Sequence, residues 1–160
     1  MVTITSLHRR RHDQAGFTLV EVLVTLAIAA IFVAIAAPAF TDLIARTRTK
    51  SVAAELYAAL SRTRSEALMR NTQMTISAKN GAWQSGWTVA STGGTNIDDR
   101  GATAGVSVSG PTSVAFNASG RLPSVTPPMF VVTSAASTTA TVCVSVDLGG
   151  RPYIKMAATC

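Results

Sequence analysis

The chain has 160 residues, the size of one domain, and its 14 Lys and Arg against 8 Asp and Glu give a formal net charge of +6. This mild basic excess favours polyanions or anionic surfaces as partners without identifying one. Both histidines, His8 and His12, precede a long apolar stretch, so the rest of the chain lacks a Ser/His or Cys/His pair, and we expect neither an enzyme nor a bound metal or cofactor.

A long apolar run occupies residues 17–40, behind a basic leader that contains Arg9, Arg10 and Arg11. As a helix it would reach about 36 Å, enough to cross about 30 Å of hydrocarbon, and it is longer than the apolar stretch of a cleaved secretory signal. We therefore predict a membrane-spanning helix. Basic residues also follow the run, so charge alone does not fix the side of the membrane on which the remainder lies.

One carboxylate, Glu21, lies near the start of this run. A charged side chain near hydrocarbon costs at least about 2.5 kcal/mol, so it is by default a functional residue. The small residues Ala30 and Ala34 are spaced as on one helical face, which would let the helix approach other helices closely. An ordinary alanine-rich anchor would show the same pattern.

The helix is predicted to continue to about Arg70, with residues 41–70 as an amphipathic half that packs on a globular domain. Apolar residues recur there with a period close to 3.6, while the basic residues fall largely elsewhere. The predicted apolar stripe consists of Ile44, Val52, Leu56, Leu60, Ala67 and Leu68.

From Asn71 onwards the composition shifts to Ser, Thr, Val and Gly, and the apolar period shifts to two. Short strands are predicted at 72–78, 86–90, 105–109, 113–117, 129–134 and 139–147. Residues 91–105 hold four glycines and are predicted as a loose loop, in which Asp98 and Asp99 form a solvated turn or, less simply, a calcium site. The predicted class is α+β, with a long N-terminal helix packed on an antiparallel sheet domain at 71–160.

The sequence GFTLVE at 16–21, between a basic leader and an apolar helix, resembles the class III signal of type IV pilins and type II secretion pseudopilins. The resemblance implies that a prepilin peptidase removes residues 1–16 by cutting between Gly16 and Phe17, and that it N-methylates Phe17. It also implies an assembly role for Glu21, whose carboxylate would pair with the Phe17 amine of a neighbouring subunit. A paired buried ion costs far less than a lone one.

Segments of the second half resemble the GspH/FimT family of minor pilins and pseudopilins. They are SEA at 65–67, WQSGW at 83–87, FNASGR at 116–121 and GR at 150–151. The resemblance implies a pilin-like fold, a single pass through the bacterial inner membrane at 17–40, and a periplasmic domain. It further implies a subunit that initiates or caps a type IV pilus or a type II secretion pseudopilus, with other pilin subunits and inner-membrane lipid as partners.

The only two cysteines are Cys143 and Cys160, and an oxidising periplasm would pair them. We predict a disulfide, worth about 3 kcal/mol in the chain-entropy model, that ties the C-terminus to a strand. Metal binding by the two thiolates is the alternative, but no histidine follows the leader to complete a site.

Some FimT-like proteins bind DNA through a basic Gly-Arg-x-Arg tail, and this resemblance gives an alternative function in DNA uptake. Here Arg151 matches the first arginine, Tyr153 stands at the second, and Lys155 follows. An aromatic ring that stacks on a base and a lysine that contacts a phosphate would suit DNA. An ordinary hairpin of 139–147 with 152–156 would use the same residues.

Overall fold

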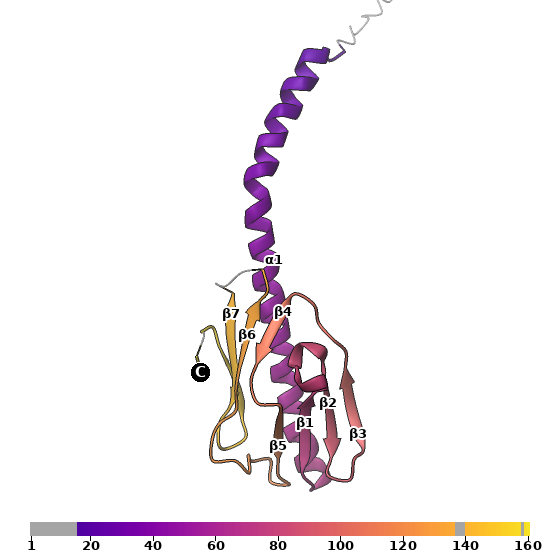
Figure 1. Ribbon diagram of the computed structural model, residues 1–160, viewed down its shortest axis with the longest axis vertical. Helices are drawn as coiled ribbons and strands as arrows, with labels where there is room; N and C mark the ends of the chain where they lie inside the picture. The colour runs from indigo at the N-terminus through magenta and orange to yellow at the C-terminus, as the bar shows by residue number, and fades with distance from the viewer. Residues whose placement is uncertain (1–15, 137–139, 158) are drawn as a thin grey trace, which may run out of the picture. The chain divides into compact units, whose positions relative to one another are not determined.

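The computed structural model describes residues 16–136, 140–157 and 159–160 (Figure 1). The predicted leader, as far as Ala15, lies outside the described residues. The packing divides the chain into a unit that ends at Pro38 and a unit from Ala39 to Cys160, and each is described by itself.

A long helix, α1 (Leu19–Arg70), occupies the first part of the described chain. Every side chain from Phe17 to Phe40 is exposed, and the helix is long and apolar enough to cross a membrane. Glu21 is the only charged residue in this part, so the run has no polar face to direct toward water. This part of α1 cannot bury its apolar surface against its own unit.

The second part of α1 is amphipathic, as predicted, and its narrow face is buried. The buried residues are Ala45, Thr49, Val52, Ala53, Leu56, Ala59, Leu60, Thr63 and Ala67. The stripe differs from the prediction at its ends: Ile44 is 54% exposed and Leu68 is 48% exposed. Each stands one residue, about 100° of helical rotation, from Ala45 or Ala67, and the smaller side chain faces the sheets.

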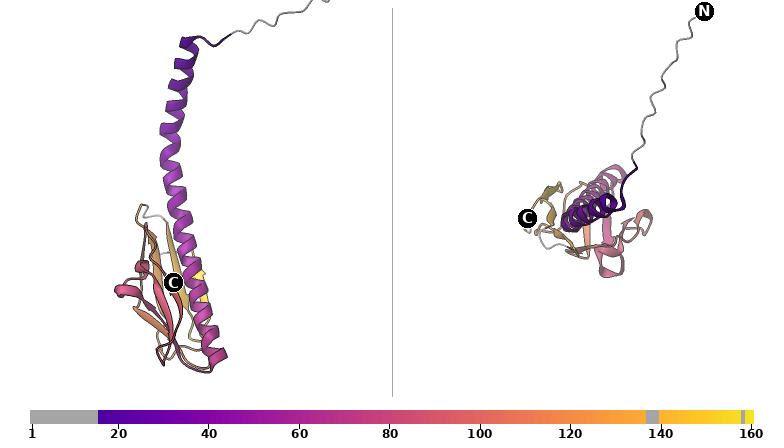
Figure 2. Two further views of the ribbon diagram at one scale, coloured as in Figure 1. Left: turned by 90° about the vertical axis from the view of Figure 1, so that its right-hand side faces the viewer. Right: turned by 90° about the horizontal axis from the view of Figure 1, so that it is seen from above.

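Two antiparallel four-stranded sheets follow, with strand orders β3-β2-β1-β5 and β4-β6-β7-β8. The strands are β1 (Met74–Ala78), β2 (Trp87–Ser91), β3 (Asn96–Arg100), β4 (Val106–Ser109), β5 (Ser113–Phe116), β6 (Met129–Ser134), β7 (Thr141–Val146) and β8 (Pro152–Lys155). Alternate residues of β4 and β6 are buried, the pattern of strands with one covered face. The second part of α1 lies along one side of the sheets (Figure 2), which confirms the predicted pilin-like α+β fold.

The core lies between α1 and the sheets, and aromatic rings fill much of it. Trp83, on the short helix η2 (Trp83–Ser85), meets Phe130 edge-on with ring centroids 4.9 Å apart. Its indole Nε1–H donates to the carbonyl of Pro111 at 2.7 Å, so the buried polar atom is satisfied. Its ring centroid also lies 6.1 Å from that of Trp87 on β2, so Trp83 contacts residues of both sheets.

The predicted loose loop at 91–105 is wrong in its centre, where β3 pairs with β2. Arg100 gives the physical reason. Its guanidinium forms an ion pair with Glu55 on α1 and stacks 4.5 Å from the centre of the Trp87 ring. These contacts fix the end of β3 to the core despite the surrounding glycines.

Asp98 and Asp99 accordingly lie on a strand, and the predicted solvated turn is wrong. Arg62 on α1 donates to Asp98 at 3.2 Å, and Lys79 forms an ion pair with Asp99. Within the described part of the chain, no group of three or more metal-binding side chains occurs.

Candidate assembly surface

The site begins with the peptide bond between Gly16 and Phe17, two residues that are both exposed. Gly16 and Phe17 both precede α1, and the Phe17 side chain is 86% exposed. A Cβ placed on Gly16 would meet no described atom within 4 Å. A protease could therefore approach the Gly16–Phe17 bond without displacing any described part of the chain.

Glu21 closes the N-terminus of α1 in a capping box with Thr18. Its Oε2 accepts hydrogen bonds of 3.0 Å from both the backbone N–H and the hydroxyl of Thr18. The Glu21 N–H donates back to the Thr18 hydroxyl at 3.2 Å. The Thr-x-x-Glu spacing that makes this box is visible in the sequence, but the sequence analysis missed it. Glu21 therefore has a local role in addition to any role between subunits.

The capping box uses only one of the two carboxylate oxygens. In residues 16–136, 140–157 and 159–160, no group donates a hydrogen bond to Oε1 of Glu21. An ionised carboxylate has lone pairs on both oxygens, so a cationic donor can bind Oε1 without breaking the cap.

The surface of the helix from Leu19 to Pro38 is otherwise largely apolar and contains small residues. Leu19 and Ile35 are 75% and 70% exposed, and Ala30 and Ala34 lie exposed between them. Lipid covers such a helix well, and the alanines leave room for the backbone of another helix. The arrangement suits contact with both lipid and helices.

At the end of the domain where α1 finishes, two turns with the same pattern lie side by side. One runs over 117–121 with the sequence NASGR, and the other over 147–151 with the sequence DLGGR. In each, the first residue donates its N–H to the carbonyl of the arginine at 3.0 Å, and its carbonyl accepts from the glycine N–H at 2.8 Å. In each, its side chain also accepts from the arginine N–H, through Asn117 Oδ1 or Asp147 Oδ1.

Arg64, on α1, holds the two turns together. Its Nε donates to the carbonyl of Gly120 at 3.0 Å, and one terminal nitrogen donates to the carbonyl of Gly149 at 3.4 Å. Gly150 has φ +82°, and a Cβ on it would overlap the carbonyl oxygen of Gly120. Because one turn follows β5 and the other joins β7 to β8, this contact links the two sheets through the helix. The sequence analysis identified both glycine-arginine segments but did not predict that they contact each other and Arg64.

The three predicted DNA-binding residues are exposed to different degrees and already have partners. The Arg151 side chain is 78% exposed, and its Nε donates to Asp147 at 3.0 Å. The backbone N–H of Arg151 in the first place, and its side chain in addition, hold the pKa of Asp147 below its ordinary value. Lys155 donates to the carbonyl oxygen of Cys160 at 2.6 Å and lies 5.6 Å from the Tyr153 ring centre.

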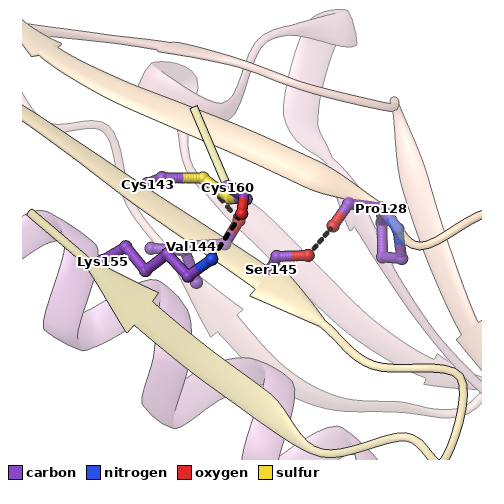
Figure 3. Close-up of a disulfide and its surroundings, with 6 residues drawn as sticks. All are labelled: Pro128, Cys143, Val144, Ser145, Lys155 and Cys160. Carbon is purple, nitrogen blue, oxygen red and sulfur yellow. Dashed lines mark hydrogen bonds between the residues drawn. A yellow bond between two sulfur atoms is a disulfide. The ribbon is translucent and has the colours of Figure 1, made fainter. Parts of the chain in front are cut away.

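Cys143 and Cys160 form the predicted disulfide (Figure 3), with a Cα–Cα distance of 5.6 Å. Cys143 is fully buried on β7, and the bond ties the end of the chain to that strand. Lys155 holds the same terminus from β8, as described above. Cys160 is therefore held by two contacts, a disulfide to β7 and a hydrogen bond from β8.

These features define a pilin-like subunit, with an apolar helix that carries one carboxylate and a second helical half packed on antiparallel sheets. The chain belongs to the family of the type II transport protein GspH, whose model matches residues 52–150, more than half of the chain. The prokaryotic N-terminal methylation motif matches residues 11–37. Both matches confirm the family predicted from the sequence.

Two crystal structures of the type IV minor pilin FimU from Pseudomonas aeruginosa strain PAO1 share this fold. The structure in space group P21 aligns with a TM-score of 0.62 and covers 69% of this chain and 90% of that chain. The structure in space group P65 gives 0.59, with 66% and 91% covered. The sequence identity is 23% in both, so the likeness shows the fold. No curated protein sequence matches the chain.

Proposed function

We propose that this chain is a minor subunit that initiates or caps a filament, either a type IV pilus or a type II secretion pseudopilus. A prepilin peptidase cuts after Gly16 and methylates the Phe17 amine. The apolar part of α1 then spans the bacterial inner membrane, with the sheet domain in the periplasm. During assembly this part of α1 packs with the helices of other pilin subunits.

The observation that supports this proposal is that only one of the two carboxylate oxygens of Glu21 accepts hydrogen bonds from described residues. The capping box satisfies Oε2 through Thr18, the residue that follows Phe17, and leaves Oε1 available within the described residues. A neighbouring subunit's amine at Oε1 would neutralise both charges in the low-dielectric helix bundle. A cap alone does not need a charge, because glutamine serves at the same position of a capping box.

The test separates these two roles of Glu21. Glu21→Gln keeps the cap and removes the charge, whereas Thr18→Val removes the cap and keeps the charge. The full-length variants are expressed in a host that assembles the filament, and their amounts in membranes and in sheared filaments are measured. We expect Glu21→Gln to remain in the membrane and to be lost from filaments, while Thr18→Val is incorporated.

The reverse result would reduce Glu21 to a helix cap. If Glu21→Gln enters filaments as the native chain does and Thr18→Val does not, then charge pairing has no part in assembly. If the native chain itself is absent from both pili and pseudopili, the proposed function is wrong.

A second candidate function is DNA binding during uptake, and one observation favours it. Arg121 and Arg151 end equivalent turns that Arg64 holds together, and both are exposed. Two cations at one end of the domain would suit neighbouring phosphates.

To test DNA binding, the full-length chain in micelles is titrated with DNA at low and moderate salt, beside the variant Arg151→Ala. Binding that falls with salt and in the variant supports this function, and no binding at low salt excludes it.

A further inference from the structure

The strand β5 exposes unused backbone hydrogen-bonding groups. Ala78 N–H donates to the carbonyl of Thr112 at 2.9 Å, and the register of β1 with β5 places Ile76 opposite Val114. Hydrogen-bonded pairs alternate in an antiparallel ladder, so Val114 and Phe116 bond to β1. The N–H and C=O groups of Ser113 and Ala115 therefore point to the other side.

No strand pairs with that side in the described part of the chain, since β5 ends the first sheet. Outside the strand ladders, no backbone hydrogen bond between described residues uses Ser113 or Ala115. They form a short row of donors and acceptors spaced as the next strand of a sheet would require.

A groove of about 460 Å³ runs beside this edge. Its lining includes Ser113, Val114 and Ala115 of β5, together with Leu122 and Met129. No charged residue lines it, and four prolines do. Met129, which lines the groove, is 47% exposed. The groove thus fits an uncharged segment with apolar side chains.

The other sheet edges are protected in ways that β5 is not. The edge strand β3 carries Asp98, Asp99 and Arg100. The edge strand β8 begins with Pro152, which has no N–H to offer, and ends with Lys155. The edge strand β4 packs against η2. Charges, proline and covering elements are the usual means of preventing strand addition, and β5 (SVAF) has neither charge nor proline.

We propose that the open edge of β5 accepts an extended, uncharged segment of another filament subunit as an additional strand of the first sheet. This inference rests on the proposed function, because it supplies a contact between the sheet domains of neighbouring subunits. The partner's backbone bonds to Ser113 and Ala115, and its alternate side chains enter the groove beside Leu122 and Met129. Specific contact between sheet domains would thereby supplement the less specific packing of the apolar helices.

The first experiment measures amide hydrogen exchange, resolved to single residues, for the full-length chain in micelles and in assembled filaments. We expect Val114 and Phe116 to be protected in both states, because β1 holds their amides. Ser113 and Ala115 exchange rapidly in micelles and become protected on assembly. Unchanged rapid exchange of both amides in filaments that contain the chain would overturn the inference.

The second experiment uses proline to remove one donor. Ala115→Pro deletes an N–H that points away from β1, so the existing sheet keeps its ladder, and Ala115→Ser is the matched control that keeps the N–H. We expect incorporation of Ala115→Pro to fall about tenfold, the effect of losing roughly one hydrogen bond with added steric exclusion. Ala115→Ser remains near the native level.

Folding is checked by formation of the Cys143–Cys160 disulfide and by thermal unfolding. If Ala115→Pro fails this check, Ser113→Lys replaces it, since an exposed lysine also blocks an edge. Native incorporation of a folded blocking variant overturns the inference, while its loss supports it. Glu21→Gln in the same assay distinguishes the two proposals: if it is lost while Ala115→Pro is retained, only the β5 inference fails.

Discussion

The two parts of α1 contain similar apolar residues but differ in how far these residues are buried within the protein. Leu26, in the first part, is 61% exposed, whereas Leu60, in the second, is fully buried. The second part alternates apolar and basic residues, so it has a face for the sheets and a face for water. The first part has no such face, and the described residues of its own unit offer it no covering partner. Substitutions should therefore affect assembly in one part and folding in the other.

The largest effect on stability is expected from truncating a buried leucine in the second part of α1. Leu60→Ala leaves a cavity between α1 and the sheets, and we expect the free energy of unfolding of the sheet domain to fall by about 2 to 5 kcal/mol. Leu26→Ala, the matched control on the same helix, leaves it unchanged because Leu26 is exposed and no described residue covers it. Chemical denaturation of both full-length variants in micelles, followed by tryptophan fluorescence, measures the difference. Equal effects would show that the first part also stabilises the domain.

The fold follows closely from the sequence where one periodicity dominates. The switch from period 3.6 to period two predicts α1 and the strands β1, β2, β4, β5, β6 and β7, because burial of one face determines both patterns. The strand β8 was considered only as the hairpin alternative to a DNA-binding tail. The strand β3 was missed because Asn96, Asp98 and Asp99 argue against a strand by propensity. Their partners, such as Arg62, are distant in the sequence and become visible only in the fold.

The site divides in the same way. Gly16, Phe17 and Glu21 stand close together in the sequence, and the capping box could have been predicted from the spacing of Thr18 and Glu21. The cluster around Arg64 could not, since it joins a helix to two turns that follow different sheets. An exposed sheet edge such as β5 also depends on strand order, which local patterns do not give.

A smaller effect is expected at the C-terminus. Cys160→Ser removes the disulfide that ties the tail to β7, and we expect the free energy of unfolding to fall by about 3 kcal/mol. The loss concerns the sheet domain alone, so membrane insertion should be unchanged. Denaturation of the native chain under reducing conditions should give the same value. A native chain insensitive to reductant would contradict the prediction.

The cation on α1 that joins the two turns should matter more than its exposed neighbour. Arg64→Ala leaves two carbonyl groups without their charged donor, and we expect a loss of about 1 to 3 kcal/mol in the free energy of unfolding. Arg62→Ala breaks only a surface ion pair with Asp98 and should cost about 0 to 1 kcal/mol. Comparing the denaturation midpoints of the two variants decides the matter. Equal midpoints would mean that the turns hold together without Arg64.

The smallest effect compares the carboxylates of the two regions, Glu21 and Asp147. Glu21 uses one oxygen within the chain, whereas Arg151 occupies both oxygens of Asp147, through its backbone N–H and its Nε. The lowered pKa of Asp147 means that its ionised form stabilises the fold above its ordinary pKa, and that this stability is lost as the pH falls through the lower value in the folded chain. Asp147→Asn, which copies the turn at Asn117, should be slightly less stable than the native chain at neutral pH.

This difference should shrink below about pH 4, where the native carboxylate takes up a proton and both side chains are neutral. Thermal unfolding of the two proteins across this range measures it. Asn117→Asp provides the reverse test, because a carboxylate at the equivalent turn beside Arg121 should introduce the same pH dependence there. If Asp147→Asn matches the native chain at every pH, the turn is held by its hydrogen bonds alone. The negative charge of Asp147 would then contribute nothing to stability, although its side chain closes a turn. Of the two carboxylates, only Glu21 in the apolar half of α1 would have a role that depends on charge.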